Sequence, residues 1–205
     1  HVHNIDPRAS TAHWRFADPS GRQVVLEIIG EKCVFYENTL GVLTNSPSFD
    51  WQLTNLNNYV NLKSGAVTEN TVGSLELHSF GGGSGMLGLP GDFTPPSRFV
   101  RAAFFQATAP KLSDADKTVI QAFHILNNFD LPIGVQTAAG ATPPDIPSAT
   151  QFTTATDLSG RKIYIRTMFN SHIRVVDLSK LNFARVKFRS ELLDPDHREP
   201  VEPLF

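Results

Sequence analysis

Asn45, Arg98 and Arg101 are the polar residues of this sequence whose surroundings best suit a chemical role. Asn45 stands in the stretch Leu43–Leu62, which concentrates carboxamides and aromatic residues more than ordinary surface loops do. β-branched and aromatic residues precede Asn45 and Ser46-Pro47 follows it, so we expect this side chain where a strand ends. Its carboxamide offers a neutral hydrogen-bond donor at that point.

The two arginines lie about one helical turn apart in an otherwise apolar segment that follows Pro95-Pro96-Ser97. A guanidinium in such surroundings needs hydrogen-bond acceptors, because burying an unpaired charge is costly. From the residues alone, two interpretations of Arg98 are equally supported. It either serves a site, or it extends to solvent or bridges to Asp92.

Other candidates for catalysis or ligand binding are weaker. Cys33 is the single cysteine, which excludes an internal disulfide and a multi-cysteine zinc site, and we interpret it as a small buried hydrophobic residue rather than a nucleophile. The histidines lack ligand spacing, although His1 and His3 could capture a stray metal, so we expect no metal and no cofactor. Gly81–Gly85 lacks the ending of a phosphate loop, and no G-x-S-x-G motif follows a strand.

The composition indicates an ordinary soluble globular protein. The chain has 205 residues, of which 40% are hydrophobic and 19% charged, with a net charge of -2, and we assign residues 1–205 to one domain. No basic excess is present that could neutralise phosphates, so we expect no nucleic acid partner. No apolar run is long enough to span a membrane. Fifteen Phe residues predict large apolar layers.

Two antiparallel meanders are predicted, one near each end of the chain. Asp18-Pro19-Ser20-Gly21 has the residue preferences of a type I turn, which predicts a hairpin, and Asn170-Ser171 predicts a tight turn later in the chain. The six predicted strands are His13–Ala17, Gln23–Ile29, Lys32–Tyr36, Gln151–Thr156, Lys162–Phe169 and His172–Asp177.

Helices are predicted between the meanders. Ser48–Leu62 shows helical spacing, Arg98–Gln106 follows a helix start, and a helix beginning at Ser113-Asp114 continues to Pro132. The apolar stripe of this last helix comprises Val119, Ile120, Phe123, Leu126 and Phe129. Residues 135–150 are predicted to be a surface loop and residues 190–205 a C-terminal tail that packs on a neighbour or frays. Sheets with helices outside predict an α+β layered fold.

Three blocks of sequence resemble the choloylglycine hydrolase and penicillin V acylase family. They read GVLTNSPSFDWQLTNLNNYVNL, GMLGLPGDFTPPSRFVRAAFF and YIRTMFNSHIRVVDLSKLNF, in the order of the family. The second block is more similar to the branch found in Gram-negative bacteria. The resemblance implies an N-terminal nucleophile hydrolase with a four-layer αββα core, of which this chain is the larger C-terminal part.

The resemblance also implies roles for two residues. Asn45 matches the asparagine of the family's LTN motif, whose amide donates to the oxyanion, and a donor of this kind commonly lowers the barrier by about 3 kcal/mol. Arg98 matches the arginine of the SRF motif, whose charge lies near the nucleophile and favours its thiolate. Arg101 is the less suitable arginine. Asn55, Asn57 and Asn58 are interpreted as structural residues of the first block.

The family's nucleophile is an N-terminal cysteine whose own α-amino group is the general base. This sequence begins at His1 and contains no counterpart of that portion, and Cys33 lacks a free α-amino group. We therefore expect the nucleophile to be absent from this chain and supplied by the N-terminal portion of the same protein. Residues 1–205 alone are expected to be inactive.

The resemblance implies a small-molecule amide substrate with an apolar acyl group, which the many Phe residues suit. Penicillin V, a bile salt and an acyl-homoserine lactone remain alternatives, and the substrate-binding residues are not identified. A homotetramer and a periplasmic or secreted location are expected, and a cytoplasmic location stays open. The competing hypothesis is a non-catalytic homologue that binds an apolar ligand or a partner subunit.

Overall fold

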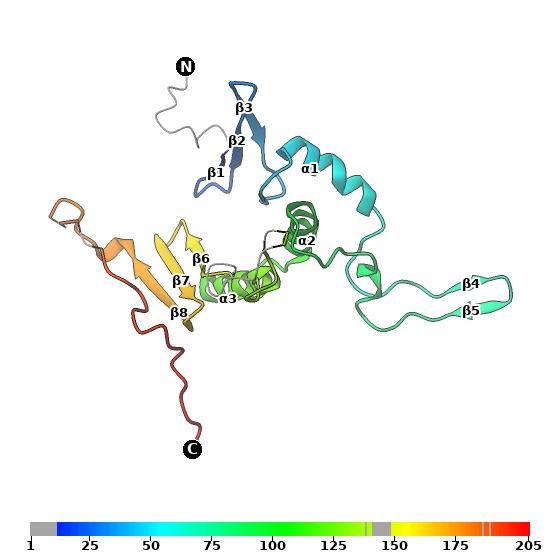
Figure 1. Ribbon diagram of the computed structural model, residues 1–205. Coiled ribbons are helices and arrows are strands. Elements are labelled where there is room, and N and C mark those ends of the chain that lie inside the picture. Colours follow the sequence, from blue (N-terminus) through cyan, green and yellow to red (C-terminus); the bar gives the residue numbers. More distant parts are fainter. Residues whose placement is uncertain (1–11, 138, 141–148, 186, 189) are drawn as a thin grey trace. The chain divides into compact units, whose positions relative to one another are not determined.

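The computed structural model of the chain describes all residues except 1–11, 138, 141–148, 186 and 189 (Figure 1). The chain forms two compact units, residues 1–110 and 111–205. Each unit contains an antiparallel three-stranded sheet, as the α+β interpretation requires. The assignment of 1–205 to one domain stays a prediction. His1 and His3 lie outside the described residues.

The first unit begins with the predicted meander. Its strands are β1 (His13–Ala17), β2 (Gln23–Ile29) and β3 (Lys32–Glu37), in the order β1-β2-β3. The amide of Gly21 donates to the carbonyl of Asp18 at 3.0 Å, which closes the predicted turn between β1 and β2. Gly21 has a φ of 88°, a conformation that glycine adopts without steric cost.

Two helices bury one face of this sheet. They are α1 (Phe49–Asn55), which continues as a 3₁₀ helix at Leu56–Tyr59, and α2 (Pro95–Thr108). Val25, Phe49 and Phe99 form the centre of the core and are at most 1% exposed. The rings of Phe49 and Phe99 meet edge to face at 6.0 Å between centroids. The predicted helices at 48–62 and 98–106 are therefore confirmed.

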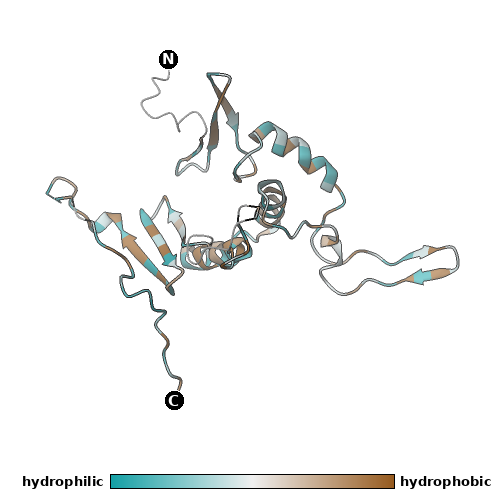
Figure 2. Cartoon of the chain, viewed as in Figure 1, coloured by the Kyte–Doolittle hydropathy of each residue, from teal (hydrophilic) through white to brown (hydrophobic). Residues whose placement is uncertain are grey.

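The opposite face of the sheet is apolar but open within this unit. Phe16 and Phe35 are 54% and 64% exposed, and the strands that carry them are rich in hydrophobic residues (Figure 2). Cys33, paired with Ile28 in β2, is also exposed, so the prediction that it is buried was wrong. The reason is the strand's period of two, because Val34 and Tyr36 face the core and Cys33 and Phe35 do not.

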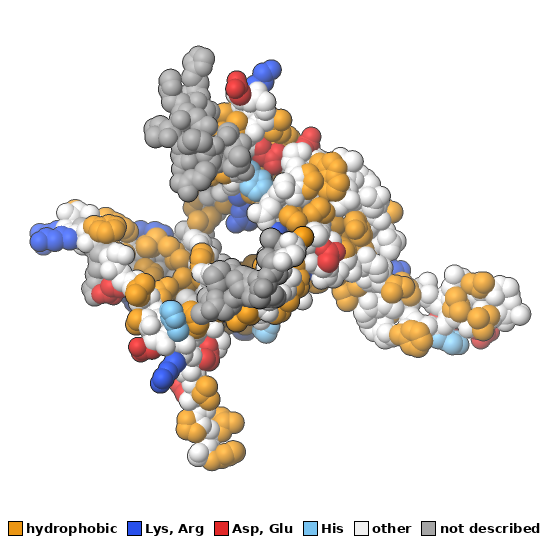
Figure 3. Space-filling view, viewed as in Figure 1, with side chains coloured by type: hydrophobic (Ala, Val, Ile, Leu, Met, Phe, Trp, Pro, Cys, Tyr) orange, Lys and Arg blue, Asp and Glu red, His pale blue; other side chains and the backbone are white. Residues whose placement is uncertain are grey.

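A second hairpin was not predicted from the sequence. It comprises β4 (Asn70–Val72) and β5 (Leu75–Leu77), and all six of its strand residues are exposed. Hydrophobic side chains gather over it (Figure 3), with Val72 61% and Leu75 63% exposed. The two-residue connection Gly73-Ser74 is a known hairpin signal, but strands of three residues are too short to show a clear alternation.

The glycine run Gly81–Gly85 ends in a close backbone contact. Gly85 lies in the 3₁₀ helix Ser84–Met86. A Cβ atom at Gly85 would lie 2.5 Å from the carbonyl oxygen of Lys63 and 2.8 Å from that of Gly65. The backbone of Gly85 also hydrogen-bonds both residues, so this position needs a residue without a side chain.

The second unit packs one helix on its sheet. Its elements are α3 (Ala115–Leu126), the 3₁₀ helix Asn127–Phe129, the strands β6 (Phe152–Asp157), β7 (Lys162–Thr167) and β8 (Asn170–Asp177), and the 3₁₀ helix Leu178–Lys180. The Asp114 carboxylate caps α3 by accepting from the Lys117 amide at 2.8 Å. The buried residues Val119, Phe123 and Tyr164 form the core.

Three predictions for the second unit need correction. Ile120 does not belong to the buried stripe, being 48% exposed, because it lies beside the line through Val119 and Phe123. The α-helix ends at Leu126, several residues before Pro132, and tightens into a 3₁₀ turn. The tight turn after β7 is formed by residues 168–169, because Asn170 already pairs with Thr167 in the sheet.

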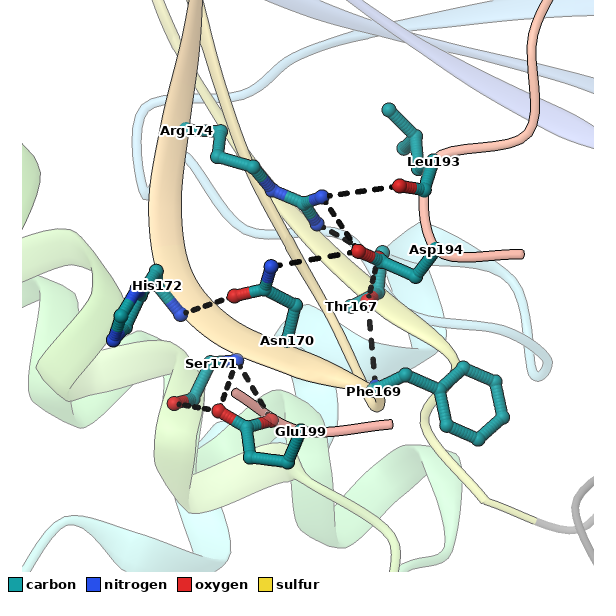
Figure 4. A network of polar contacts seen from close by, with 9 residues as sticks. All are labelled: Thr167, Phe169, Asn170, Ser171, His172, Arg174, Leu193, Asp194 and Glu199. Atoms are coloured by element: carbon teal, nitrogen blue, oxygen red, sulfur yellow. Dashed lines mark hydrogen bonds and ion pairs between the residues drawn. The ribbon is translucent and has the colours of Figure 1, made fainter. Parts of the chain in front are cut away.

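Polar contacts fasten the C-terminal tail to the β7–β8 hairpin (Figure 4). The two oxygens of Asp194 accept from the guanidinium of Arg174 at 2.8 and 2.9 Å. Glu199 accepts from the backbone N–H of Ser171 at 2.9 Å and from its hydroxyl at 2.6 Å. The ring of His197 stacks on Phe169 at 4.3 Å. The tail at 190–205 therefore packs on its own sheet over residues 194–199.

The predicted surface loop at 135–150 lies mostly outside the described residues. Among the residues that are described, none of the helices has the length and apolar character needed to cross a membrane.

Candidate active site

Asn45 follows a turn that is built by a buried asparagine. The side chain of Asn38 accepts from the Gly41 amide at 2.9 Å and donates to the Val42 carbonyl at 3.0 Å. Residues 41–44 form no strand, so the expectation of a strand that ends at Asn45 was wrong. The reason is that the backbone of this segment pairs with the side chain of Asn38 and not with a neighbouring strand.

The next residue ties this segment to α2. The hydroxyl of Thr44 donates to the carbonyl of Pro95, the first residue of α2, at 3.1 Å. Proline at the first helical position suits a helix start, because its missing N–H would have no partner there. Asn45 is thereby held beside the first turns of α2, where Arg98 lies.

Arg98 and Asn45 contact each other directly. Nη2 of Arg98 donates to Oδ1 of Asn45 at 2.5 Å, and Nε of Arg98 donates to the carbonyl of Phe93 at 3.0 Å. The guanidinium is half-buried, and burial lowers its pKa, to which the nearby charge of Arg101 adds. A guanidinium keeps its proton in proteins all the same, so Arg98 brings a fixed positive charge to this position.

The contact also orients the carboxamide of Asn45. Because Oδ1 accepts from Arg98, the NH₂ of Asn45 is the group left for another partner, and it is a donor only. Asn45 is exposed, so this donor is accessible. The hollow around the pair is lined by His13, Arg15, Leu43, Thr44, Asn45 and Arg98, all from the first unit.

Arg101 occupies a different environment from Arg98. It is 6% exposed, and its Nη1 donates to the carbonyls of Pro90 and Asp92 at 2.7 and 2.6 Å. Arg101 therefore supports the loop that precedes α2. That Arg98 is the more suitable arginine for a site stays a prediction. The three asparagines of the first block make local contacts at the end of α1, where Asn57 donates to Thr54 and Asn58 to Asn55.

The loop before α2 is organised by Asp92. Its carboxylate accepts from the hydroxyls of Ser97 and Thr94, each at 2.6 Å, and from the Thr94 amide at 2.8 Å. These hydrogen bonds, that of Ser97 first, lower the pKa of Asp92 to about 2. The same loop carries the Phe93 carbonyl that accepts from Arg98. Asp92 therefore supports the position of Arg98 indirectly, through this loop.

Sequence reasoning missed two residues at this site, His13 and Glu27. Both line a second hollow that Asn45 shares. Glu27 is 5% exposed and lies within β2. The sequence does contain a sign of Glu27, because it is an acidic residue inside the mainly apolar strand Gln23–Ile29. Acidic residues are rarely buried without a partner, so its position there calls for one.

Comparison with known proteins places the chain in a family. Residues 2–201 match the family model of linear amide C-N hydrolases, choloylglycine hydrolase family. The chain is 39% identical to the bile salt hydrolase/transferase of Clostridium perfringens, covering 84% of this chain and 51% of that protein. It is 29% identical to the penicillin V acylase of Pectobacterium atrosepticum, covering 86% of this chain and 44% of that protein.

Solved structures agree in fold. A variant of the conjugated bile acid hydrolase from Clostridium perfringens, with its second residue changed from cysteine to alanine, matches with a TM-score of 0.80 at 33% identity over 94% of this chain and 57% of that chain. The penicillin V acylase from Agrobacterium tumefaciens matches with a TM-score of 0.62 at 26% identity over 82% and 46%.

The chain belongs to the choloylglycine hydrolase family of linear amide C-N hydrolases. It spans about half the length of the curated relatives it matches. The predicted family resemblance is confirmed, and the solved relatives support the N-terminal nucleophile hydrolase fold that it implies. The four-layer arrangement, and the place of this chain as the larger C-terminal part, stay predictions. The Gram-negative branch stays a prediction.

Proposed function

We propose that this chain forms the larger part of an amide hydrolase that cleaves non-peptide C–N bonds through an acyl-enzyme. The observation that carries the proposal is the 2.5 Å contact between Arg98 and Asn45 beside one shared hollow. It joins a fixed positive charge, which can lower the pKa of a nearby thiol, and a neutral hydrogen-bond donor, which can stabilise the oxyanion of acyl transfer.

Asn45 serves as the oxyanion donor. Attack on an amide carbonyl places negative charge on its oxygen, and an N–H already oriented toward that oxygen stabilises the transition state without reorganising. Arg98 supplies the orientation by occupying Oδ1 of Asn45. The preorganised donor is commonly worth about 3 kcal/mol of barrier.

Arg98 serves a second purpose through its charge. A guanidinium near a cysteine lowers the pKa of the thiol and increases the fraction of thiolate, which is the attacking species. Because Arg98 is half-buried, its field is less screened than that of a surface arginine. Its hydrogen bonds to Phe93 and Asn45 keep it in place.

The nucleophile of the proposal is an N-terminal cysteine supplied by the N-terminal portion of the same protein. The cysteine named as the second residue of the solved bile acid hydrolase supports this assignment. The open apolar face of β1–β3, with Phe16 and Phe35, supports a further layer of the αββα core that covers it. Residues 1–205 alone then lack the nucleophile and part of the core.

The proposed substrate is a small amide with an apolar acyl group. Bile salts and penicillin V come from the names of the relatives, and acyl-homoserine lactones are the third alternative. We extend the proposal to a homotetramer and to a periplasmic or secreted location.

A substrate panel tests the proposal. The complete protein, including its N-terminal portion, is assayed side by side on glycocholate, penicillin V and a long-chain acyl-homoserine lactone, with residues 1–205 as the control. We expect hydrolysis of at least one substrate by the complete protein and none by the control. Turnover by residues 1–205 alone, or a mature N-terminus without cysteine, would contradict the assignment of roles.

A further inference from the structure

Glu27 is a carboxylate buried in the middle of an apolar strand. It is 5% exposed and faces the core side of β2 together with Val25. Burying a charged group costs several kcal/mol unless hydrogen bonds compensate for the lost water. A residue of this kind in a strand therefore needs partners that hold it there.

The partners of Glu27 come from two other segments. Both oxygens accept from the backbone N–H of Phe49, at 2.9 and 3.1 Å. Oε1 also lies 3.2 Å from Nδ1 of His13, the residue directly opposite Glu27 on β1. Glu27 thus joins the sheet to the start of α1.

Phe49 is the first residue of α1 and closes the short segment that carries Asn45. Ser48, at the usual capping position, makes no capping hydrogen bond and instead donates to Asp50 at 2.5 Å. Glu27, distant in sequence, satisfies the N–H of Phe49, one of the amides at the start of α1 that have no partner within the helix. This contact fixes the end of the segment that follows Asn45.

The other end of the segment is fixed by α2. Thr44 donates to the carbonyl of Pro95, and Arg98 donates to Asn45. Residues 45–48 are exposed or half-buried and span the distance between these two anchors. The position of the Asn45 donor therefore depends on the Glu27 anchor as well as on α2.

We propose that Glu27 is a positioning residue for the Asn45 oxyanion donor, acting through the N–H of Phe49. The inference rests on the proposed function, because it assigns Glu27 a role in the same site. A displacement of about 1 Å of a catalytic group can reduce a rate on the order of 100-fold. Loss of the anchor should therefore lower kcat rather than substrate affinity.

The test compares Glu27→Leu and Glu27→Gln in the complete protein. Leu fills the space without an acceptor, whereas the Oε1 of Gln still accepts from Phe49. We expect Glu27→Leu to lower kcat by about 100-fold with KM within about threefold, and Glu27→Gln to stay within about fivefold of the wild type. Glu76→Gln, an exposed acid on β5, is the matched control and should leave both values unchanged.

A double-mutant cycle separates positioning from general support of the fold. If Glu27 acts through Asn45, Glu27→Leu in an Asn45→Ala background should change kcat by less than about threefold. If the fold losses in kcat of the two single variants instead multiply in the double variant, the two residues act independently and the inference is overturned. A folded Glu27→Leu protein with wild-type kcat would overturn it as well. Should Glu27→Leu fail to fold, Glu27→Asp, whose shorter side chain withdraws the acceptor, takes its place in the cycle.

The cycle also distinguishes the two proposals. If Asn45→Ala lowers kcat strongly and Glu27→Leu leaves kcat unchanged, the role of Glu27 is overturned and that of Asn45 stands. If Asn45→Ala itself leaves kcat unchanged, the oxyanion assignment fails and the role of Glu27 fails with it.

Discussion

The side chain of Asn45 is oriented by its contact with Arg98. A carboxamide can present either an acceptor or a donor, and the hydrogen bond from Arg98 to Oδ1 leaves the donor for a substrate. The same guanidinium holds the carbonyl of Phe93, so the loop before α2 and the segment of Asn45 share one anchor. Conditions that disturb this loop should therefore disturb the site.

Asp92 gives the loop a dependence on pH. Its hydrogen bonds from Ser97 and Thr94 lower its pKa from 3.8 to about 2, so the carboxylate stabilises the fold above its unfolded pKa. That contribution is lost as the pH falls from near 4 through about 2. Asp92 is mainly exposed, so we expect Asp92→Ala to lower the free energy of unfolding by only about 1 kcal/mol at neutral pH.

Urea unfolding at several pH values measures this effect. The difference in stability between the wild type and Asp92→Ala should be constant above about pH 5 and shrink toward pH 2. Glu76→Gln, which removes an exposed charge from β5, should show no such trend. A gap that widens in acid would refute the assignment.

Prediction from sequence succeeded unevenly at this scale. Asn45 and Arg98 were singled out because their motifs carry a family resemblance, and the structure brings the two side chains into contact, while their roles stay predictions. Glu27 was missed because a strand pattern records hydrophobicity, whereas the need for an acceptor arises from the amide of Phe49, 22 positions later in the chain. Cys33 was misplaced because its strand is apolar on both faces and only one is covered in this unit.

At the level of helices, strands and turns, contacts of the backbone fix positions that the local sequence does not determine. The glycine run before α2 has no periodicity, yet Gly85 is held against the carbonyls of Lys63 and Gly65. The turn after β7 was placed two residues late, because Asn170 suits a turn as well as the start of β8. Strong turns such as Asp18–Gly21 were predicted correctly because their residues satisfy the turn locally.

Gly85→Ala tests the close approach at this position. The added Cβ would meet backbone atoms at 2.5 and 2.8 Å, which cannot move as a flexible side chain would. We expect the free energy of unfolding to fall by about 1–3 kcal/mol, as measured by denaturant titration.

Gly82→Ala is the matched control for this variant. No atom lies within 4 Å of a Cβ placed at Gly82, and its φ is not positive. Its effect should remain within about 0.5 kcal/mol. Equal stabilities of the two variants would contradict the packing described for the glycine run.

At the scale of the whole molecule, the chain ends in a segment that its own sheet holds. Asp194 accepts a bidentate pair of hydrogen bonds from Arg174. The hydrogen bond from Arg174 is the main cause that lowers the pKa of Asp194, and the one from Thr167 is the second. The tail was predicted only as a segment that packs or frays, because its partners on the β7–β8 hairpin lie about 20 to 28 positions earlier.

Asp194→Ala should release this tail. We expect trypsin to cleave after Arg198 about tenfold faster in the variant, because loss of the charge-assisted pair with Arg174 increases the population in which the tail is detached. Limited proteolysis followed by mass spectrometry measures the rate. Asp196→Ala, an exposed neighbour, should leave it unchanged, and equal cleavage of both variants would show that Asp194 does not hold the tail.

The most direct test of the account is the kcat of Asn45→Ala in the complete protein, measured on its best substrate from the panel. Loss of the oxyanion donor should lower kcat by about 100- to 1,000-fold, while KM and the free energy of unfolding stay near the wild-type values. Asn57→Ala, which removes an exposed carboxamide at the end of α1, serves as the control and should retain activity. A kcat of Asn45→Ala within about twofold of the wild type would contradict the proposed active site.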